Sequence, residues 1–279
     1  MKIIEERKVF DGRQIRVEHL ADTTNCNMTF SIYLPPQAAS KKVPVIYWLS
    51  GLTCTDENFV IKAGAQRYAA EYGVAIVCPD TSPRGDGVQD SEDQAYDLGL
   101  GAGFYVNATQ GDWKSHYQMY SYIVDELPAL IAGQFSVDID RASICGHSMG
   151  GHGALVIGFR NSQKFKSVSA FSPIANPLAC PWGQKAFLAY LGDNKDEWQE
   201  YDACHLINLV DEQIPLLIDQ GDKDEFLLTQ LHPMALENAA GNADYPMVLR
   251  MQEGYDHSYF FISSFIGEHI AFHARYLVE

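Results

Sequence analysis

Residues 146–150, Gly-His-Ser-Met-Gly, contain the G-x-S-x-G motif, whose central residue, Ser148, can act as a nucleophile. Residues 141–145 predict a short buried strand before the motif, and residues 151–159 predict a helix after it. A serine exposed at such a turn needs strained backbone, and the flanking glycines remove Cβ atoms that would collide. The helix dipole also favours a negative intermediate at the serine. We therefore interpret Ser148 as a nucleophile rather than as part of an ordinary glycine-rich turn.

A serine hydroxyl is a weak nucleophile, so it needs a neighbouring base that is oriented by an acid. In proteins with this motif, the acid and then the histidine follow the serine along the chain, on loops after later strands. Residues 245–251 predict the last strand, and the loop after it contains His257 before a final predicted helix. Of the nine histidines, only His257 combines a late loop with a following helix, so we predict that it is the base.

The acid is expected on the loop that follows the strand predicted at residues 214–219. Three carboxylates lie there, Asp222, Asp224 and Glu225. Their positions favour Asp224 only slightly, and the other two stay open as alternatives.

Two backbone amides must stabilise the oxyanion of an acyl-transfer intermediate. The residue after the nucleophile, Met149, supplies one, and the loop after an early strand supplies the other. We predict Leu52 for the second amide, although an ordinary strand-to-helix connection would also explain Gly51 beside it. Cys54 lies next to this loop, and we expect it to be either a thiol near the site or a partly buried structural residue.

The predicted elements that position these residues alternate between strand and helix, which indicates an α/β class with a mainly parallel sheet covered on both faces. We see no repeat or linker and predict one domain over residues 1–279. The long segment 79–112 is rich in Gly, Asp and Ser but carries aromatic residues, so we expect an ordered wall of a site. The strands are predicted at 2–10, 13–20, 28–34, 43–49, 74–78, 141–145, 167–171, 214–219 and 245–251, and the helices at 59–72, 113–132, 151–159, 184–190, 196–202, 227–240 and 257–276.

Composition excludes several other classes of protein. The formal net charge of −16 disfavours nucleic acid and anionic membranes as partners, because both would be repelled. No apolar run approaches membrane-spanning length, and the charged start lacks the features of a signal peptide, so we expect a cytoplasmic protein. The six cysteines form no C-x-x-C pair, which is typical of reduced thiols. His269 and His273 lack the H-E-x-x-H pattern, so no metal site is expected.

Motifs throughout the chain resemble those of the S-formylglutathione hydrolase family, also called esterase D. The most specific are Thr-Ser-Pro-Arg-Gly at 81–85, Gly-Ala-Gly-Phe-Tyr at 101–105 and Tyr-Asp-His-Ser-Tyr at 255–259. The pentapeptide around Ser148 alone is shared by many hydrolases. Further matching segments lie at 50–54, 79–80, 146–153, 180–183 and 219–221.

The resemblance implies a single-domain α/β-hydrolase fold and a cofactor-free serine thioesterase. Its expected reaction is cleavage of S-formylglutathione to formate and glutathione, in formaldehyde detoxification, with carboxylesterase activity on small acyl esters. It also implies a triad of Ser148, Asp224 and His257, with oxyanion amides at Leu52 and Met149. A broader carboxylesterase or an acyltransferase is the alternative enzyme. A non-catalytic relative is disfavoured because all three triad residues are present.

Local groups must recognise glutathione, because a strongly acidic protein does not attract its carboxylates as a whole. We expect Lys185 to meet a carboxylate and Tyr105 and Trp182 to shape the acyl pocket, with Cys54 nearby. Core packing beside Pro181 is an equal alternative for Trp182. The sequence leaves a homodimer open.

Overall fold

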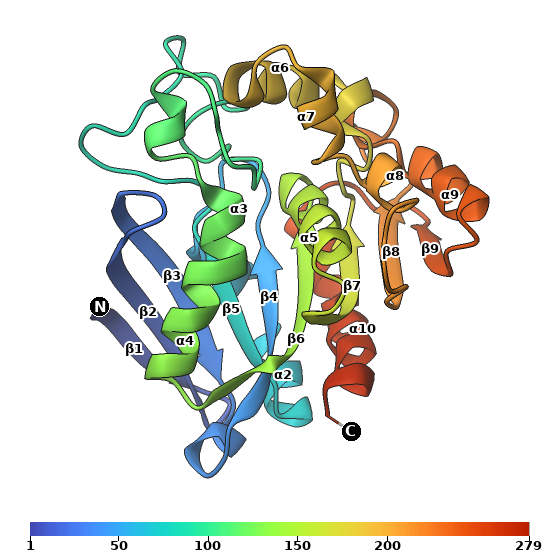
Figure 1. Ribbon diagram of the computed structural model, residues 1–279. Coiled ribbons are helices and arrows are strands. Elements are labelled where there is room, and N and C mark those ends of the chain that lie inside the picture. The colour runs from blue at the N-terminus through green and yellow to red at the C-terminus, as the bar shows by residue number, and fades with distance from the viewer. Residues whose placement is uncertain (279) are drawn as a thin grey trace.

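The computed structural model describes residues 1–278, and its centre is a nine-stranded sheet (Figure 1). The strand order is β1-β2-β3-β5-β4-β6-β7-β8-β9. Pairing is antiparallel from β1 to β5 and parallel from β5 to β9, which confirms the predicted mainly parallel sheet. The strands are β1 (Lys2–Val9), β2 (Gly12–Ala21), β3 (Cys26–Leu34), β4 (Val43–Leu49), β5 (Ala75–Pro79), β6 (Val137–His147), β7 (Phe165–Phe171), β8 (Leu216–Gly221) and β9 (Met247–Gln252).

Helices cover both faces of the sheet (Figure 1). On one face α4 and α5 pack against the central strands, and on the other face α10 packs with α1 and α2. Every residue of β4 is buried, as expected for a central strand between two helical layers. The helices are α1 (Glu57–Lys62), α2 (Gln66–Tyr72), α3 (Met119–Ser121), α4 (Leu127–Gln134), α5 (Met149–Arg160), α6 (Pro181–Leu191), α7 (Lys195–Gln199), α8 (Ala203–Leu206), α9 (Pro233–Asn242) and α10 (Tyr259–Leu277).

Two of the predicted helices are interrupted in their N-terminal halves. The helix predicted at 59–72 is two helices, α1 and α2, separated at Gly64, whose φ of +67° an α-helix cannot contain. The helix predicted at 113–132 begins with a 3₁₀ turn, Trp113–Ser115, and continues only from Met119. A π-helical turn, Tyr122–Glu126, precedes Pro128, which lacks the N–H of a regular helical hydrogen bond.

The helix predicted at 227–240 is also divided, and its break lies close to the site described below. Residues Leu227–Leu231 form a π-helical turn, and His232 has a φ of +51°. Pro233 then begins α9, and a proline disfavours helical backbone in the residue before it. The short helix α8 was not predicted from the sequence.

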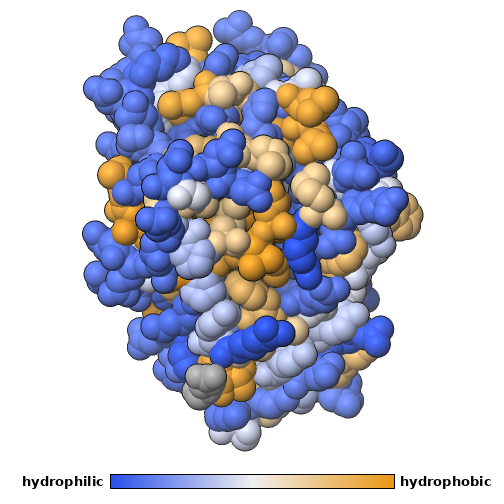
Figure 2. Space-filling model, turned by 90° about the vertical axis from the view of Figure 1, so that its right-hand side faces the viewer, coloured by the Kyte–Doolittle hydropathy of each residue, from blue (hydrophilic) through white to orange (hydrophobic). Residues whose placement is uncertain are grey.

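β9 is the edge strand on the side opposite β1. Figure 2 shows this side of the molecule, where a band of hydrophobic residues crosses a mostly hydrophilic surface. The side chains of Val248 and Met251 on β9 are exposed, while α9 packs against the strand. Within residues 1–278, no helix is both long enough and apolar enough to cross a membrane.

Five histidines are buried, and four of them, His147, His152, His269 and His273, lie on β6, α5 and α10. Burial lowers the pKa of each imidazole, because the charged form loses its hydration. For His152, burial lowers the pKa to about 4, against the hydrogen bond that its Nε2–H donates to the carbonyl of Phe104. These side chains are therefore neutral in the folded protein near pH 7.

We expect the folded protein to lose stability as the pH falls from 7 to 5. His152 titrates near pH 6.5 in the unfolded chain but only near 4 when folded, so protons bind preferentially to the unfolded state in between. This one residue contributes a loss of about 2 kcal/mol at pH 5. Urea denaturation of His152→Gln, which keeps an amide donor, should show a pH-dependent loss smaller by that amount.

The matched control is the exposed His205, whose change to Gln should leave the pH dependence as in the wild type. An equal loss of unfolding free energy in His152→Gln and wild type would contradict the assignment.

Candidate active site

Ser148 lies in strained backbone between β6 and α5, with φ 56° and ψ −118°. Non-glycine residues rarely adopt this conformation, which costs about 1–3 kcal/mol. The surrounding chain holds it in place. The Ser148 amide donates to the carbonyl of Phe171 at 3.0 Å, and the Ser148 carbonyl accepts from the amides of His152 at 2.9 Å and Ile174 at 3.2 Å. The predicted strand–turn–helix context of the motif is therefore present.

The glycines beside Ser148 are required by close backbone contacts. A Cβ on Gly146 would lie 2.1 Å from the carbonyl oxygen of Gly150, and a Cβ on Gly150 would lie 1.9 Å from that of Leu49. Neither backbone atom can move away without displacing its strand or helix. These contacts explain why the motif carries glycine at both flanks of Ser148.

His257 and Asp224 form a short hydrogen bond, with 2.6 Å between Nδ1 and Oδ2. Asp224 also accepts from the amide of Phe226 at 2.9 Å and from Nε2 of Gln220 at 3.2 Å. Burial alone would raise the pKa of Asp224, but the hydrogen bond and charge of His257 and the Phe226 amide outweigh it, so the pKa is lowered. Asp224 is therefore ionised near neutral pH and can orient the imidazole through Nδ1–H.

The other two candidate acids face elsewhere. Asp222 accepts a hydrogen bond from the amide of Gly254 at 2.7 Å, which ties together the two loops that carry Asp224 and His257. Glu225 is exposed to solvent. Of the three carboxylates that the residues alone left open, only Asp224 hydrogen bonds to His257, so Asp224 stays the predicted acid.

Ser148 and His257 line one cavity of about 340 Å³ at the carboxyl ends of the parallel strands, which we call the cleft. The imidazole of His257 lies between two rings, with centroid distances of 4.5 Å to His147 and 5.0 Å to Phe226. The residues that line the cleft are Gly51, Leu52, Thr53, Cys54, Asn58, Lys62, Tyr96, His147, Ser148, Trp182, Phe226, His257, Ser258 and Tyr259.

The predicted oxyanion amides flank the nucleophile. Gly51 lies so close to Ser148 that a Cβ built on it would be 3.1 Å from the Ser148 Cβ. Leu52 follows Gly51 directly. Within residues 1–278, neither the Leu52 amide nor the Met149 amide donates to a protein acceptor. Thr53 has a φ of +66° and donates to the carbonyl of Gly101, which holds the loop in this position. Both amides are free to bind a ligand oxygen.

Of the four predicted substrate contacts, two line the cleft. Cys54 is 8% exposed, and burial raises the pKa of its thiol, so it is a protonated, buried thiol at the edge of the cleft. Trp182 donates from Nε1 to the hydroxyl of Tyr96 at 3.1 Å and packs against Phe226 with a centroid distance of 4.7 Å. These three aromatic residues form one wall of the cleft.

The other two predicted contacts, Tyr105 and Lys185, do not line the cleft. Tyr105 is completely buried, and its hydroxyl donates to the carbonyl of Ser50 at 2.9 Å, so it supports the oxyanion loop from beneath. Lys185 does not line the cleft, because its ammonium pairs with Asp97 at 2.6 Å. That ion pair fastens the segment 79–112 to α6.

Sequence reasoning missed several residues of the cleft, namely Asn58, Lys62, Tyr96, Phe226 and Tyr259. Tyr96 lies in the segment 79–112 that was predicted to form a wall, so its aromatic character was a usable signal. Lys62 ends α1 and carried no signal, because nothing local to that helix indicates which way its side chain extends.

A second set of serine, histidine and aspartate side chains lies behind the sheet. His273 hydrogen bonds to Ser169 and Ser167 at 2.7 Å each, and His269 contacts Ser169 at 2.8 Å and Asp219 at 3.3 Å. All of these side chains are buried at 1% exposure or less. A substrate cannot reach Ser169 there, so this network joins α10 to β7 and β8 rather than forming a competing nucleophilic site.

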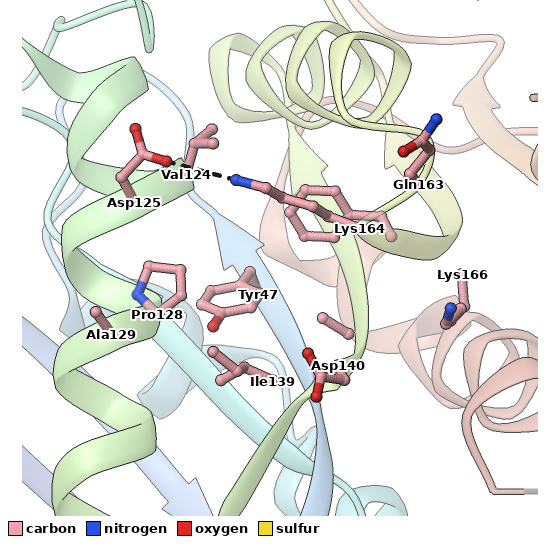
Figure 3. Close-up of a pocket in the computed structure, with 12 residues that line it drawn as sticks. Tyr47, Val124, Asp125, Pro128, Ala129, Ile139, Asp140, Gln163, Lys164 and Lys166 are labelled. Atoms are coloured by element: carbon pink, nitrogen blue, oxygen red, sulfur yellow. Dashed lines mark hydrogen bonds and ion pairs between the residues drawn. The ribbon is translucent and has the colours of Figure 1, made fainter. Parts of the chain in front are cut away.

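A larger cavity, of about 560 Å³, lies between α4 and the beginnings of β6 and β7 (Figure 3). Its lining has no serine, cysteine or histidine, and Lys164 pairs with Asp125 across it at 3.4 Å. The Tyr47 hydroxyl inside has no hydrogen-bond partner, and burial raises its pKa, so it stays protonated. This cavity holds no serine, cysteine or histidine that could form a triad, and the smaller cleft at Ser148 is the candidate active site. Within residues 1–278, no group of three His, Cys, Asp or Glu side chains is placed to hold a metal ion.

Comparison with known proteins identifies the family of the chain. Residues 21–272 match the family model described as "Putative esterase". The chain is 57% identical over 273 residues to an S-formylglutathione hydrolase of Arabidopsis thaliana, covering 97% of this chain and 95% of that protein. The chain belongs to the S-formylglutathione hydrolase family.

Solved structures place the family in a wider fold. The S-formylglutathione hydrolase of Agrobacterium tumefaciens superposes with a TM-score of 0.97 at 46% identity, covering 99% of this chain and 100% of that one. A fluorophosphonate-binding serine hydrolase of Staphylococcus aureus gives a TM-score of 0.76 at 20% identity, covering 94% and 98% of the two chains, which is a likeness of fold. The predicted α/β-hydrolase fold is thereby confirmed.

The contacts of Gly150 predict a strong effect of adding one methyl group. Gly150→Ala should lower the free energy of unfolding by at least about 3 kcal/mol, because its Cβ overlaps the backbone of β4. The control is Gly133→Ala in α4, where nothing lies within 4 Å of the new Cβ. That change should be neutral or stabilise the protein by up to about 1 kcal/mol. Urea denaturation measures both, and similar midpoints would contradict the steric argument.

The hydrogen bond between Asp224 and His257 predicts unequal effects of two aspartate substitutions. Asp224→Asn should lower kcat by about 10³- to 10⁴-fold, because an amide no longer holds the imidazole in the required tautomer. Asp222→Asn keeps a carbonyl acceptor for Gly254 and should stay within about tenfold of wild type. Steady-state kinetics on one ester substrate compares them. The reverse order would exclude Asp224 as the acid.

Proposed function

We propose that this protein is a serine thioesterase that hydrolyses S-formylglutathione to formate and glutathione. The observation that carries the proposal is the hydrogen-bonded pair His257–Asp224 in a cleft that also contains Ser148 on strained backbone. Membership of the S-formylglutathione hydrolase family supports the choice of substrate.

In the first half of the reaction, the Ser148 hydroxyl attacks the formyl carbon while His257 accepts its proton. The amides of Leu52 and Met149 stabilise the resulting oxyanion, aided by the N-terminus of α5. The carbon–sulfur bond then breaks, and His257 returns its proton to the glutathione sulfur. Thiolates are good leaving groups, so this step needs less assistance from the acid than loss of an alkoxide.

In the second half, water attacks the formyl ester of Ser148 and gives a proton to His257. The second oxyanion collapses, the serine oxygen is reprotonated, and formate leaves. Asp224 stays ionised throughout and stabilises the imidazolium that forms twice in each cycle. No step requires a cofactor, so we propose a cofactor-free reaction.

The aromatic wall of Tyr96, Trp182 and Phe226 supports a preference for short acyl groups. Trp182 is only 5% exposed, donates a hydrogen bond to Tyr96 and packs against Phe226, so its indole limits the space on this side of the cleft. We propose that small acyl esters are side substrates and that each added methylene of the acyl group costs about 1–3 kcal/mol of transition-state binding.

We place this activity in the cytoplasm, in formaldehyde detoxification. All six cysteines are unpaired, and Cys54, Cys78, Cys145 and Cys180 are buried, which suits a reducing compartment.

The proposed function predicts that Ser148→Ala abolishes turnover of S-formylglutathione, with a fall in kcat of about 10⁴-fold or more. The substituted protein should remain folded, because the change removes one side-chain oxygen that caps no helix and whose loss leaves the backbone hydrogen bonds of Ser148 in place. Thiol release measured with S-formylglutathione and colour release from p-nitrophenyl acetate should both stop.

For the wild type, kcat/KM should be higher for S-formylglutathione than for p-nitrophenyl acetate. Undiminished turnover by the Ser148→Ala protein would contradict the mechanism. A wild type that prefers the neutral ester would instead support a general carboxylesterase.

A further inference from the structure

The lining of the cleft has an unusual charge balance for so acidic a protein. The chain contains 36 aspartate and glutamate residues, yet none of those within residues 1–278 lines the cleft. Apart from the histidines, Lys62 at the C-terminal end of α1 is the only ionisable cation that the described part of the chain contributes to the lining. The cleft therefore differs in charge from the rest of the surface, and it favours a ligand that carries a carboxylate.

The ammonium of Lys62 is not engaged by any protein acid. Within residues 1–278, no carboxylate lies within 4 Å of its Nζ, and the neighbouring Glu57 pairs with Arg16 instead at 2.9 Å. Lys62 contacts the ring of Tyr259, with its Nζ 5.3 Å from the ring centroid. Tyr259 begins α10 two residues after His257, so the charge stands on the side of the cleft that carries the predicted base.

We propose that Lys62 forms a carboxylate subsite that binds the glutathione portion of the substrate. This inference rests on the proposed function and adds a residue that selects the leaving group. Glutathione carries a glycyl and a γ-glutamyl carboxylate, and one of them lies beside Lys62 while the thioester carbon lies at Ser148.

The rest of the lining leaves Lys62 as the only candidate for this role. The wall of Tyr96, Trp182 and Phe226 is aromatic and uncharged, and the ammonium of Lys185, which is not part of the lining, is neutralised by Asp97. A lone cation near a negatively charged surface has two effects. It attracts the anionic substrate into the cleft, and it compensates the repulsion that the net charge of −16 exerts on that substrate.

The experiment compares two thioesters with the same reacting group. S-Formylglutathione carries carboxylates, whereas the formyl thioester of N-acetylcysteamine carries none. In Lys62→Met the ratio of kcat/KM for the first over the second should fall about tenfold, mainly through KM. Lys62→Arg should restore most of the ratio, because the charge returns. The ratio for wild type should also fall with added salt, and that for Lys62→Met should not.

Lys41→Met is the matched control. Lys41 is exposed and precedes β4 at the end of the sheet opposite the cleft, so the same charge is removed from the protein without changing the lining. Its ratio should equal that of the wild type. If Lys41→Met lowers the ratio as much as Lys62→Met, or if neither does, the subsite is excluded.

The glycyl ethyl ester of S-formylglutathione identifies the carboxylate. If the Lys62→Met effect disappears on this ester, Lys62 binds the glycyl carboxylate, and if it persists, Lys62 binds the γ-glutamyl carboxylate. An equal effect of Lys62→Met on the neutral thioester would overturn the proposal. A wild type inactive on S-formylglutathione would instead refute the proposed function, so the two failures are distinguishable.

Discussion

The conformation of Ser148 is the constraint on which the rest of the structure depends. Its backbone at φ 56° places the side chain in the cleft, and it costs free energy that the neighbouring contacts must offset. Three hydrogen bonds hold the residue between β7 and α5, and two glycines let the strand and the helix approach it. Any looser packing of β4, β6 and α5 would allow the turn to relax and withdraw the hydroxyl.

The sheet brings the other candidate residues to the same edge as Ser148. Parallel strands end at the same edge, so loops after β8 and β9 reach the cleft although they lie far from Ser148 in the sequence. Asp222 joins the two loops through Gly254, and the buried network of His269, His273 and Asp219 ties α10 to β7 and β8. The short bond between His257 and Asp224 thus rests on contacts at both faces of the sheet.

The charged residues of the protein are distributed unevenly between the cleft and the rest of the molecule. Acidic residues lie elsewhere on the protein, but the lining of the cleft contains Lys62 and no carboxylate. Lys185, which local reasoning favoured, fastens the segment 79–112 by pairing with Asp97. One lysine therefore stabilises the wall of the cleft, and another is left free to meet a ligand.

The sequence by itself determined the motif around Ser148, the order of its partners and most strands, because these depend on local sterics and on runs of apolar residues. It could not choose among Asp222, Asp224 and Glu225, since that choice depends on how the loop turns after β8. It also misplaced Tyr105 and Lys185 and passed over Lys62. Whether such a side chain lies beneath a loop, in an ion pair or in a cleft is decided by residues distant in the chain, which only the tertiary structure brings together.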